Sequence, residues 1–215
     1  ITGCIRRCKP LVVVSHDLDG EYGHGTHVLC ADALGAALQS AADPAQYPES
    51  AGEYGVWQVE KTYLHLYGEN PVVMDWDVPL EHFGGKTAFQ VTQEGFGCHK
   101  SQHWTWFYKW IYGTDGAPIT KASQISRYSP CLFGLYDTQV GLDEAGGDFF
   151  EHVKPYAQRR AEAEEAAQAE AFAGLNRFLR NAGLPLAHDL GFRFNAGGVV
   201  MLHVPDIGVS PALHV

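Results

Sequence analysis

The segment from Val14 to His27 reads VSHDLDGEYGHGTH and holds three histidines and three carboxylates. Imidazole and carboxylate groups bind metal ions and transfer protons near neutral pH. His24 and His27 are three residues apart, a spacing that places both side chains on one face of a helical turn. One of them could bind a metal ion while the other acts as an acid or hydrogen-bond donor. The alternative is a pair of exposed histidines on a polar loop.

The position of this segment in the chain favours the chemical interpretation. It follows the apolar run Leu11–Val14 and precedes an Ala/Leu-rich run that starts at Val28. In open α/β sheets, ligands bind beyond the carboxyl ends of strands. A calcium loop starting at Asp17 is excluded, because its sixth and twelfth positions hold Tyr22 and Val28 instead of Gly and an acidic residue. The sequence also lacks the G-x-S-x-G motif of serine hydrolases and any glycine-rich phosphate loop.

The elements around the segment are predicted from hydrophobic patterning. Leu11–Val14 is a β-branched apolar run, typical of a strand buried on both faces in a parallel sheet. Thr26 is predicted to cap a helix from about His27 to Ala42. The apolar face of this helix would carry Cys30, Leu34, Ala37, Leu38 and Ala41. Strand, loop and helix together form half of a βαβ unit.

The rest of the chain shows weaker patterns. Strands are expected at residues 59–67, 72–74 and 199–204, a broken helix at 87–104, irregular structure at 113–130, and a long helix within 149–182 that stops before Gly183. The aromatic run Trp104–Tyr112 has two interpretations, core packing and sugar stacking, of which packing is favoured. The predicted organisation is a domain at residues 1–150, a long Ala/Glu-rich helix or linker at 151–183, and a small extension at 184–215.

Composition limits the class of partner. The chain has 215 residues and a net charge of −10, which argues against nucleic acid because phosphate binding needs clustered Lys and Arg. Its five cysteines are irregularly spaced and odd in number, so a disulfide framework is not indicated. We find no apolar run long enough to span a membrane.

The histidine segment resembles a motif of the LmbE/PIG-L family of zinc-dependent N-deacetylases. These enzymes remove acetyl groups from N-acetylglucosamine conjugates and similar molecules. The stretch from Tyr22 to His27, YGHGTH, is similar to the family's second motif, in which an aromatic residue and Gly precede His-Pro-Asp-His. The lead-in from Ile5 to Pro10, the pair His16-Asp17, and an H-x-S-Q element at His99 are also similar. The resemblance covers roughly residues 1–150.

The resemblance implies a role for each matching residue. His27 would be a zinc ligand. His24 would be the unliganded histidine that stabilises the tetrahedral intermediate and protonates the leaving amine. Tyr22 would lie near the substrate carbonyl. His16 and Asp17 would lie behind the metal ligands and support them.

Two departures from the family pattern affect these expectations. Gly25 and Thr26 stand where the family has Pro and Asp. The family's first motif, similar to Ala-His-Pro-Asp-Asp-Glu, does not occur in the 215 residues. We therefore expect either the C-terminal portion of a longer enzyme, with its N-terminal portion missing, or a pseudoenzyme. Zinc binding by this chain alone is expected to be weak or absent.

The sequence thus predicts an α/β, Rossmann-like layered domain with an appended C-terminal helix. The expected activity is zinc-dependent hydrolysis of an N-acetyl group on a small-molecule amino-sugar conjugate. The competing hypothesis is a non-catalytic carbohydrate-binding or interaction protein that keeps the fold and the aromatic run.

Overall fold

The computed structural model describes residues 1–144, 148–187, 192–194, 199–202 and 212–214. These residues form two compact units, 1–153 and 154–215, and we describe each unit by itself. The three-part organisation expected from the sequence stays a prediction.

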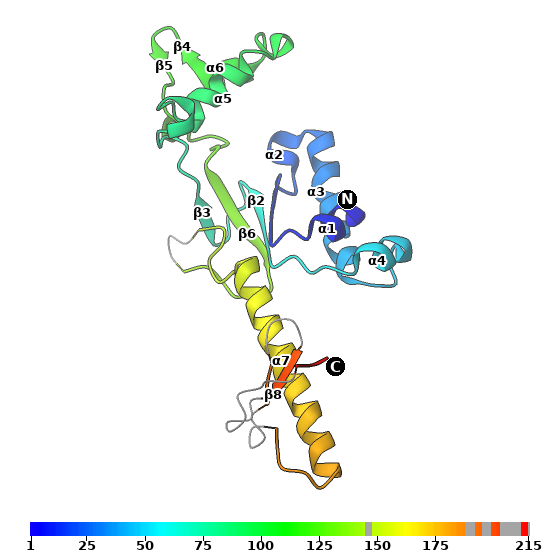
Figure 1. Ribbon diagram of the computed structural model, residues 1–215. Coiled ribbons are helices and arrows are strands. Elements are labelled where there is room, and N and C mark those ends of the chain that lie inside the picture. Colours follow the sequence, from blue (N-terminus) through cyan, green and yellow to red (C-terminus); the bar gives the residue numbers. More distant parts are fainter. Residues whose placement is uncertain (145–147, 188–191, 195–198, 203–211, 215) are drawn as a thin grey trace. The chain divides into compact units, whose positions relative to one another are not determined.

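The first unit is built on a four-stranded sheet (Figure 1). Its strands are β1 (Val12–Ser15), β2 (Lys61–His65), β3 (Pro71–Val73) and β6 (Leu132–Thr138), in the order β1-β2-β6-β3. β1 and β2 are parallel, whereas β6 is antiparallel to both β2 and β3. The α/β class is therefore confirmed, as are the predicted strands at β2 and β3. Rossmann-like layering stays a prediction.

Strand β1 is less buried than the sequence predicted. Val12 pairs with Lys61, and Ser15 with Leu64, which confirms the parallel direction. In the described part of the sheet, however, β1 lies at the edge and pairs only with β2. Val14 is consequently 44% exposed, so the expectation of burial on both faces was wrong.

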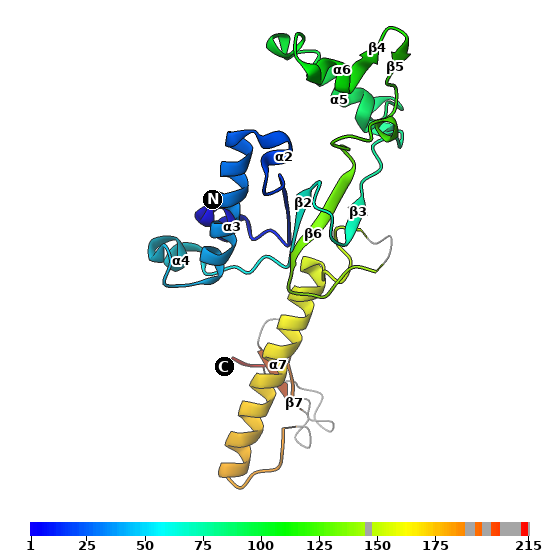
Figure 2. The same cartoon turned by 180° about the vertical axis from the view of Figure 1, so that it is seen from behind.

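Helices α1 (Thr2–Cys8), α3 (Gly25–Ala42) and α4 (Pro48–Tyr54) gather on the β1 side of the sheet (Figures 1 and 2). Helix α3 is the predicted one, but it begins at Gly25, so Thr26 lies in its first turn instead of capping it. Cys30, expected on the apolar face, is exposed. The hydrophobic cluster between these elements contains Ile5, Ala37, Leu38, Ala41 and Val59, with Val13, Leu34 and Trp57 packed against it.

Arg6 joins these helices from the inside. Its side chain is fully buried, and its guanidinium donates hydrogen bonds to oxygen atoms where α3 ends and α4 begins. The acceptors are the backbone carbonyls of Ser40, Ala41, Asp43, Gln46 and Tyr47, at 2.6–3.2 Å, and the Ser50 hydroxyl at 2.7 Å. One cation thus binds carbonyls at the end of α3 together with carbonyls of the turn that leads into α4.

A second group of elements lies between β3 and β6 in the sequence. It comprises η1 (Glu81–Phe83), α5 (Ala88–Phe96), η2 (Lys100–Gln102), α6 (Trp106–Tyr112), the hairpin β4 (Gly113–Thr114) and β5 (Ala117–Pro118), and η3 (Ala122–Gln124). The break between α5 and η2 confirms the predicted broken helix. The aromatic run is only partly packed: Trp110 and Tyr112 contact the cluster around Phe89 and Ile111, but Trp104 and Trp106 are 94% and 47% exposed.

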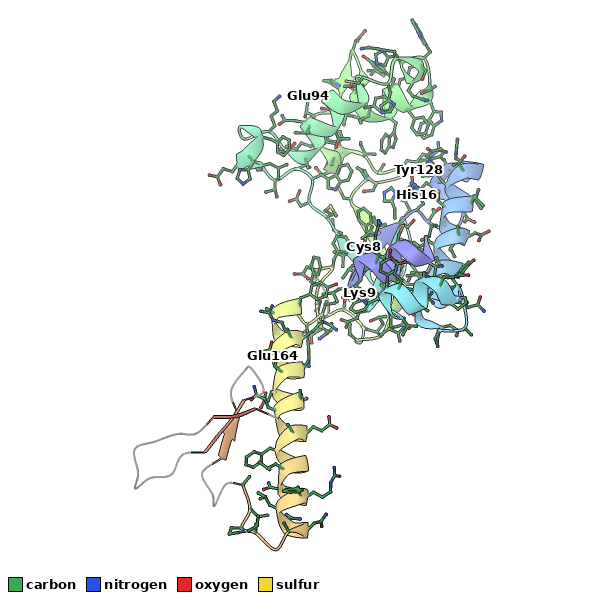
Figure 3. All side chains as sticks on the ribbon, turned by 45° about the vertical axis from the view of Figure 1, so that its right-hand side comes forward. Cys8, Lys9, His16, Glu94, Tyr128 and Glu164 are labelled. Atoms are coloured by element: carbon green, nitrogen blue, oxygen red, sulfur yellow. The ribbon has the colours of Figure 1, made fainter. Side chains whose placement is uncertain are left out.

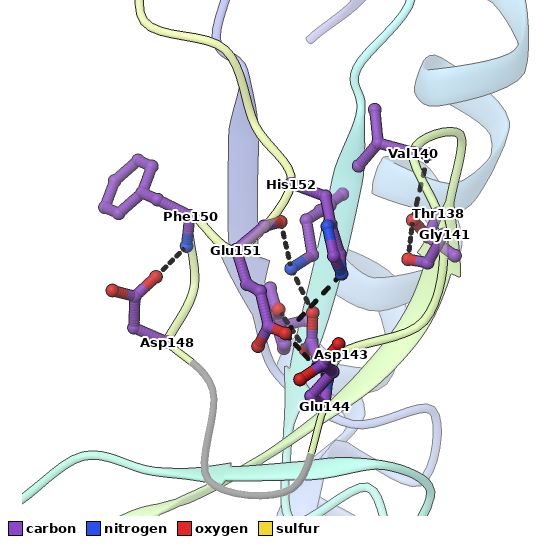
Figure 4. A network of polar contacts seen from close by, with 11 residues as sticks. Thr138, Val140, Gly141, Asp143, Glu144, Asp148, Phe150, Glu151 and His152 are labelled. Atoms are coloured by element: carbon purple, nitrogen blue, oxygen red, sulfur yellow. Dashed lines mark hydrogen bonds and ion pairs between the residues drawn. The ribbon is translucent and has the colours of Figure 1, made fainter.

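A buried polar network fastens the end of the first unit to β2 (Figure 4). The Lys61 ammonium donates to the Asp143 carboxylate and, at 3.0 Å, to the Glu151 carbonyl. The Tyr63 hydroxyl donates to Asp143 Oδ2 at 2.5 Å. Burial, with the neighbouring carboxylate, raises the pKa of Tyr63, which therefore stays a donor. The segment that follows β6 is thereby held against the start of β2.

The second unit contains α7 (Tyr156–Asn181) and an antiparallel sheet of β7 (Phe192–Phe194), β8 (Val199–Leu202) and β9 (Ala212–His214). The predicted long helix and the strand at 199 are both present, although residues 203–204 lie outside the described residues. None of the described helices is both long and apolar enough to cross a membrane.

Candidate active site

The segment after β1 makes a tight turn, α2 (Gly20–Gly23), before α3 begins. Gly20 has φ +67°, and a Cβ there would come within 2.8–2.9 Å of Val28 atoms, so only glycine fits. Glu21 also has a positive φ of 66°, which is strained for a residue with a side chain. The Glu21 amide donates a hydrogen bond to the Asp17 carboxylate. Strained backbone of this kind persists where the surrounding structure enforces it.

The turn places the Glu21 carboxylate between two histidines. Glu21 Oε1 lies 2.9 Å from His16 Nδ1 and 2.6 Å from His65 Nδ1. His16 directly follows β1, and His65 is the last residue of the parallel neighbour β2. On its other side, His65 Nε2 lies 2.8 Å from the Ser129 carbonyl. The carboxyl ends of two parallel strands therefore supply one connected polar group.

The charges of this group stabilise each other. Burial alone would raise the pKa of Glu21, but hydrogen bonds from His65 and His16 lower it to about 2. Burial likewise opposes the charged form of His65, yet the hydrogen bond and the charge of Glu21 raise its pKa. Glu21 is therefore an anion at neutral pH, held between two imidazoles.

Four of the residues predicted from the sequence come together beside Glu21. The rings of His16 and His27 stack at a centroid distance of 4.1 Å, and His24 lies 4.7 Å from His27. The Tyr22 ring contacts His24 at 6.0 Å and His27 at 5.3 Å. The fifth predicted residue, Asp17, contacts Glu21 instead: its carboxylate accepts the hydrogen bond from the Glu21 backbone amide. The roles of these residues are untested by this arrangement.

His27 has the properties of a metal ligand. Its Nδ1 is buried and makes no hydrogen bond within the described residues. Burial, together with the nearby His16, lowers the pKa of His27, which favours the neutral imidazole that binds metal ions. Atoms of His16, Glu21 and His27 that could each ligate an ion all lie within 4.8 Å of one another. Two imidazoles and one carboxylate are a donor set that suits Zn²⁺.

Sequence reasoning missed two members of this group, Glu21 and His65. In the sequence, Glu21 is the third carboxylate of the calcium-loop pattern that starts at Asp17, and that pattern is excluded. His65 stands at the end of the second predicted strand, and the carboxyl ends of parallel strands share one edge of a sheet. That rule, applied to the strands at 11–14 and 59–67, was the signal that could have found His65.

Aromatic side chains flank the histidines on the Tyr22 side. The Tyr22 ring lies 5.9 Å from Trp106, 4.8 Å from Phe107 and 6.3 Å from Tyr128. Figure 3 labels His16 and Tyr128 in this region. His99 stands apart from the cluster: it is exposed and its ring contacts Phe96 at 6.0 Å.

Comparison with curated proteins finds similarity to deacetylases. A protein named 1D-myo-inositol 2-acetamido-2-deoxy-alpha-D-glucopyranoside deacetylase 1, from Catenulispora acidiphila, is 39% identical over 143 residues, which are 65% of this chain and 39% of that protein. The deacetylase of the same name from Rhodococcus jostii is 44% identical over 63 residues, 29% of this chain and 20% of that protein. The one from Geodermatophilus obscurus is 39% identical over 59 residues, which are 27% of this chain and 19% of that protein.

The similarity is therefore partial, because the matched region spans only 19–39% of the length of these three relatives. No protein-family model matches the chain. No solved structure matches it.

Proposed function

We propose that this protein is a zinc-dependent N-deacetylase of the LmbE/PIG-L family that hydrolyses the N-acetyl group of an amino-sugar conjugate. The main support is the convergence of His16, Glu21, His24 and His27 at the carboxyl ends of two parallel strands. The names of the partial relatives, which are deacetylases of an acetamido sugar linked to inositol, support the substrate class. A Rossmann-like layered domain is the fold that this proposal implies.

His27, His16 and Glu21 would hold the zinc ion. This ligand set differs from the sequence-based expectation, which placed His16 behind the ligands and expected weak or absent zinc binding by this chain alone. Their number, donor types and mutual distances fit, and the buried His27 Nδ1 lacks another partner in the described chain. A zinc ion held by these residues would polarise a carbonyl and would lower the pKa of a water to about 7. His65 and Asp17 would orient Glu21 from behind, through its carboxylate and its amide.

The remaining residues act on the substrate. In amide hydrolysis a water oxygen adds to the acetyl carbon, the C–N bond breaks, and the nitrogen takes up a proton as acetate leaves. His24 is exposed and lies beside His27, so it is positioned to stabilise the developing oxyanion and to protonate the departing nitrogen. Tyr22, whose ring contacts both histidines, would lie near the substrate carbonyl.

Two single variants test this division of roles. His27→Ala should empty the metal site, whereas His24→Ala should keep zinc and lower kcat by about 10²–10³-fold. Zinc content after dialysis and acetate release from an N-acetylated amino sugar measure the two effects. His82→Ala, which changes an exposed histidine in η1, serves as the control.

The opposite pattern would contradict the assignment. Loss of zinc in His24→Ala, or retained zinc in His27→Ala, means that the roles within the pair are wrong. Saturable binding of the sugar without any acetate release would instead favour the non-catalytic carbohydrate-binding hypothesis.

A further inference from the structure

The aromatic residues beside the histidine cluster form a continuous group. Trp106 and Phe107 stack at a centroid distance of 4.0 Å and an interplanar angle of 24°. Tyr128 lies 5.9 Å from Trp106. Tyr22 joins this group to the site, because its ring contacts Trp106, Phe107, His24 and His27. Residues from two distant segments of the chain, 106–107 and 128, thus contact Tyr22, which in turn contacts His24 and His27.

Trp106 is placed unlike a core residue. Ile111, on the same short helix, is 2% exposed, whereas Trp106 is 47% exposed even though Phe107 stacks on it and Tyr22 meets it at 85°. Much of its indole surface is therefore open to solvent next to the site. An aromatic ring that is part of a contiguous aromatic group and is open to solvent beside the site offers a surface on which a ligand ring can lie.

The surroundings hold this surface in place. Trp110 and Tyr112, four and six residues further along α6, pack against the cluster around Ile111 and anchor the helix. The Trp110 indole donates a hydrogen bond to the Arg127 carbonyl at 2.8 Å. The Arg127 guanidinium lies 4.9 Å from the centre of the Tyr128 ring. The Trp110–Arg127 hydrogen bond thus ties together the two backbone segments that carry Trp106 and Tyr128, which lowers the entropic penalty of binding.

We propose that Trp106, with Tyr128 beside it, stacks on the pyranose ring of the acetamido sugar and so selects sugar amides over linear amides. The inference rests on the proposed deacetylase function and names the residues that would set its substrate class. One face of a pyranose presents C–H groups, and these complement the negative face of an indole. A sugar stacked on Trp106 would direct its substituents toward Tyr22 and His24, where the acetyl group is to be cleaved.

The test compares two N-acetyl compounds in the full chain, N-acetylglucosamine and N-acetyl-lysine. Binding is followed by ligand-observed NMR and turnover by acetate release, with Trp106→Ala, Trp106→Phe and Trp104→Ala as variants. Trp104→Ala is the matched control, because Trp104 is the same residue type two positions away and is 94% exposed. Trp106→Ala should weaken N-acetylglucosamine binding by roughly tenfold, leave N-acetyl-lysine unchanged, and be largely rescued by Phe.

The inference fails if Trp106→Ala affects both amides equally or neither of them, or if Trp104→Ala weakens sugar binding as much. It also fails if the unaltered chain shows no saturable binding of N-acetylglucosamine. Binding and turnover are read separately, so the two proposals can fail independently. If the sugar binds in a way that depends on Trp106 but no acetate is released, only the proposed deacetylase function is wrong. If the sugar is deacetylated equally well with and without Trp106, only the proposed stacking role of Trp106 is wrong.

Discussion

Glu21 is the residue on which the candidate site depends most. It accepts a positive φ of 66°, and its carboxylate bridges His16 and His65 from the ends of two strands. Replacing it removes both contacts and leaves two histidines without the anion that positions them. The sequence contains this residue within the histidine-rich segment, but nothing local distinguishes it from Asp17 or Asp19. Its importance arises from the turn that aims it, which is a property of the folded chain.

The pH dependence of stability should reveal Glu21 in the metal-free protein. The folded-state pKa of about 2 lies below the ordinary value of 4.5, so ionised Glu21 stabilises the fold above about pH 4.5. This stabilisation, of order 1–3 kcal/mol, should disappear as the pH falls from about 5 toward 2. Glu21→Gln should remove that part of the acid dependence of the free energy of unfolding, measured with urea at several pH values.

Glu69→Gln provides the comparison, because Glu69 is an exposed glutamate beyond the end of β2. If Glu21→Gln and the unaltered protein lose stability in parallel as the pH falls, the bridging carboxylate does not stabilise the fold.

At the scale of elements, Arg6 is the contact that holds α1, α3 and α4 together. Its guanidinium reaches six oxygen acceptors, a pattern that the shorter, single-headed ammonium of lysine cannot reproduce. We expect Arg6→Lys to lower the free energy of unfolding by about 3 kcal/mol or more, because several carbonyls each lose a hydrogen bond from a buried cation.

Arg7→Lys is the matched control, since Arg7 is the neighbouring arginine and is exposed. Chemical unfolding of both variants measures the difference. Equal stability of the two variants would show that the buried hydrogen bonds of Arg6 contribute little.

Hydrophobic patterning predicted those elements whose pattern is local. The apolar run at β1, the three- and four-residue spacing of α3 and the Ala/Glu composition of α7 each indicate the observed element type. Strand β6 was missed, because Gly134 interrupts its apolar run Leu132–Leu135. A Cβ at Gly134 would collide with the Tyr67 carbonyl, so the glycine marks a close backbone contact between β6 and the connection from β2 to β3, and not a break in the chain.

The edge position of β1 was also beyond local patterning. Val12–Val14 has the composition of a buried strand, but the number of neighbours a strand receives is decided by the whole sheet. For the site, the spacing predicted that His24 and His27 lie side by side, and their ring centroids are 4.7 Å apart. The contribution of His65 requires knowing that β1 and β2 are adjacent, and that information is long-range.

At the scale of the whole molecule, the first unit should keep its structure without the second. All contacts that form the candidate site, and the network of Lys61, Asp143 and Glu151, lie within residues 1–153. A chain ending at Val153 should therefore give the same NMR signals for the histidines of residues 1–153 as the full chain does, with a free energy of unfolding within about 0.5 kcal/mol for this unit.

A shorter chain ending at Leu142 tests whether the buried network of Lys61, Asp143 and Glu151 is needed for the stability of the first unit. It lacks Asp143 and Glu151 and leaves the fully buried Lys61 ammonium without its carboxylate. Removing one partner of a buried ion pair costs about 3–5 kcal/mol. If the two truncated chains are equally stable, the buried network is not what closes the first unit.

The strand order has a consequence for how fast this protein reaches its native state. No strand of the main sheet pairs with its neighbour through a short hairpin: Val12 pairs with Lys61, Lys61 with Thr138, and Val72 with Phe133. Each pairing closes a long loop before any stabilising contact forms, so the relative contact order is high. Refolding is therefore expected on the millisecond-to-second timescale typical of non-local topologies, and on the ribosome the sheet cannot assemble until β6 has emerged.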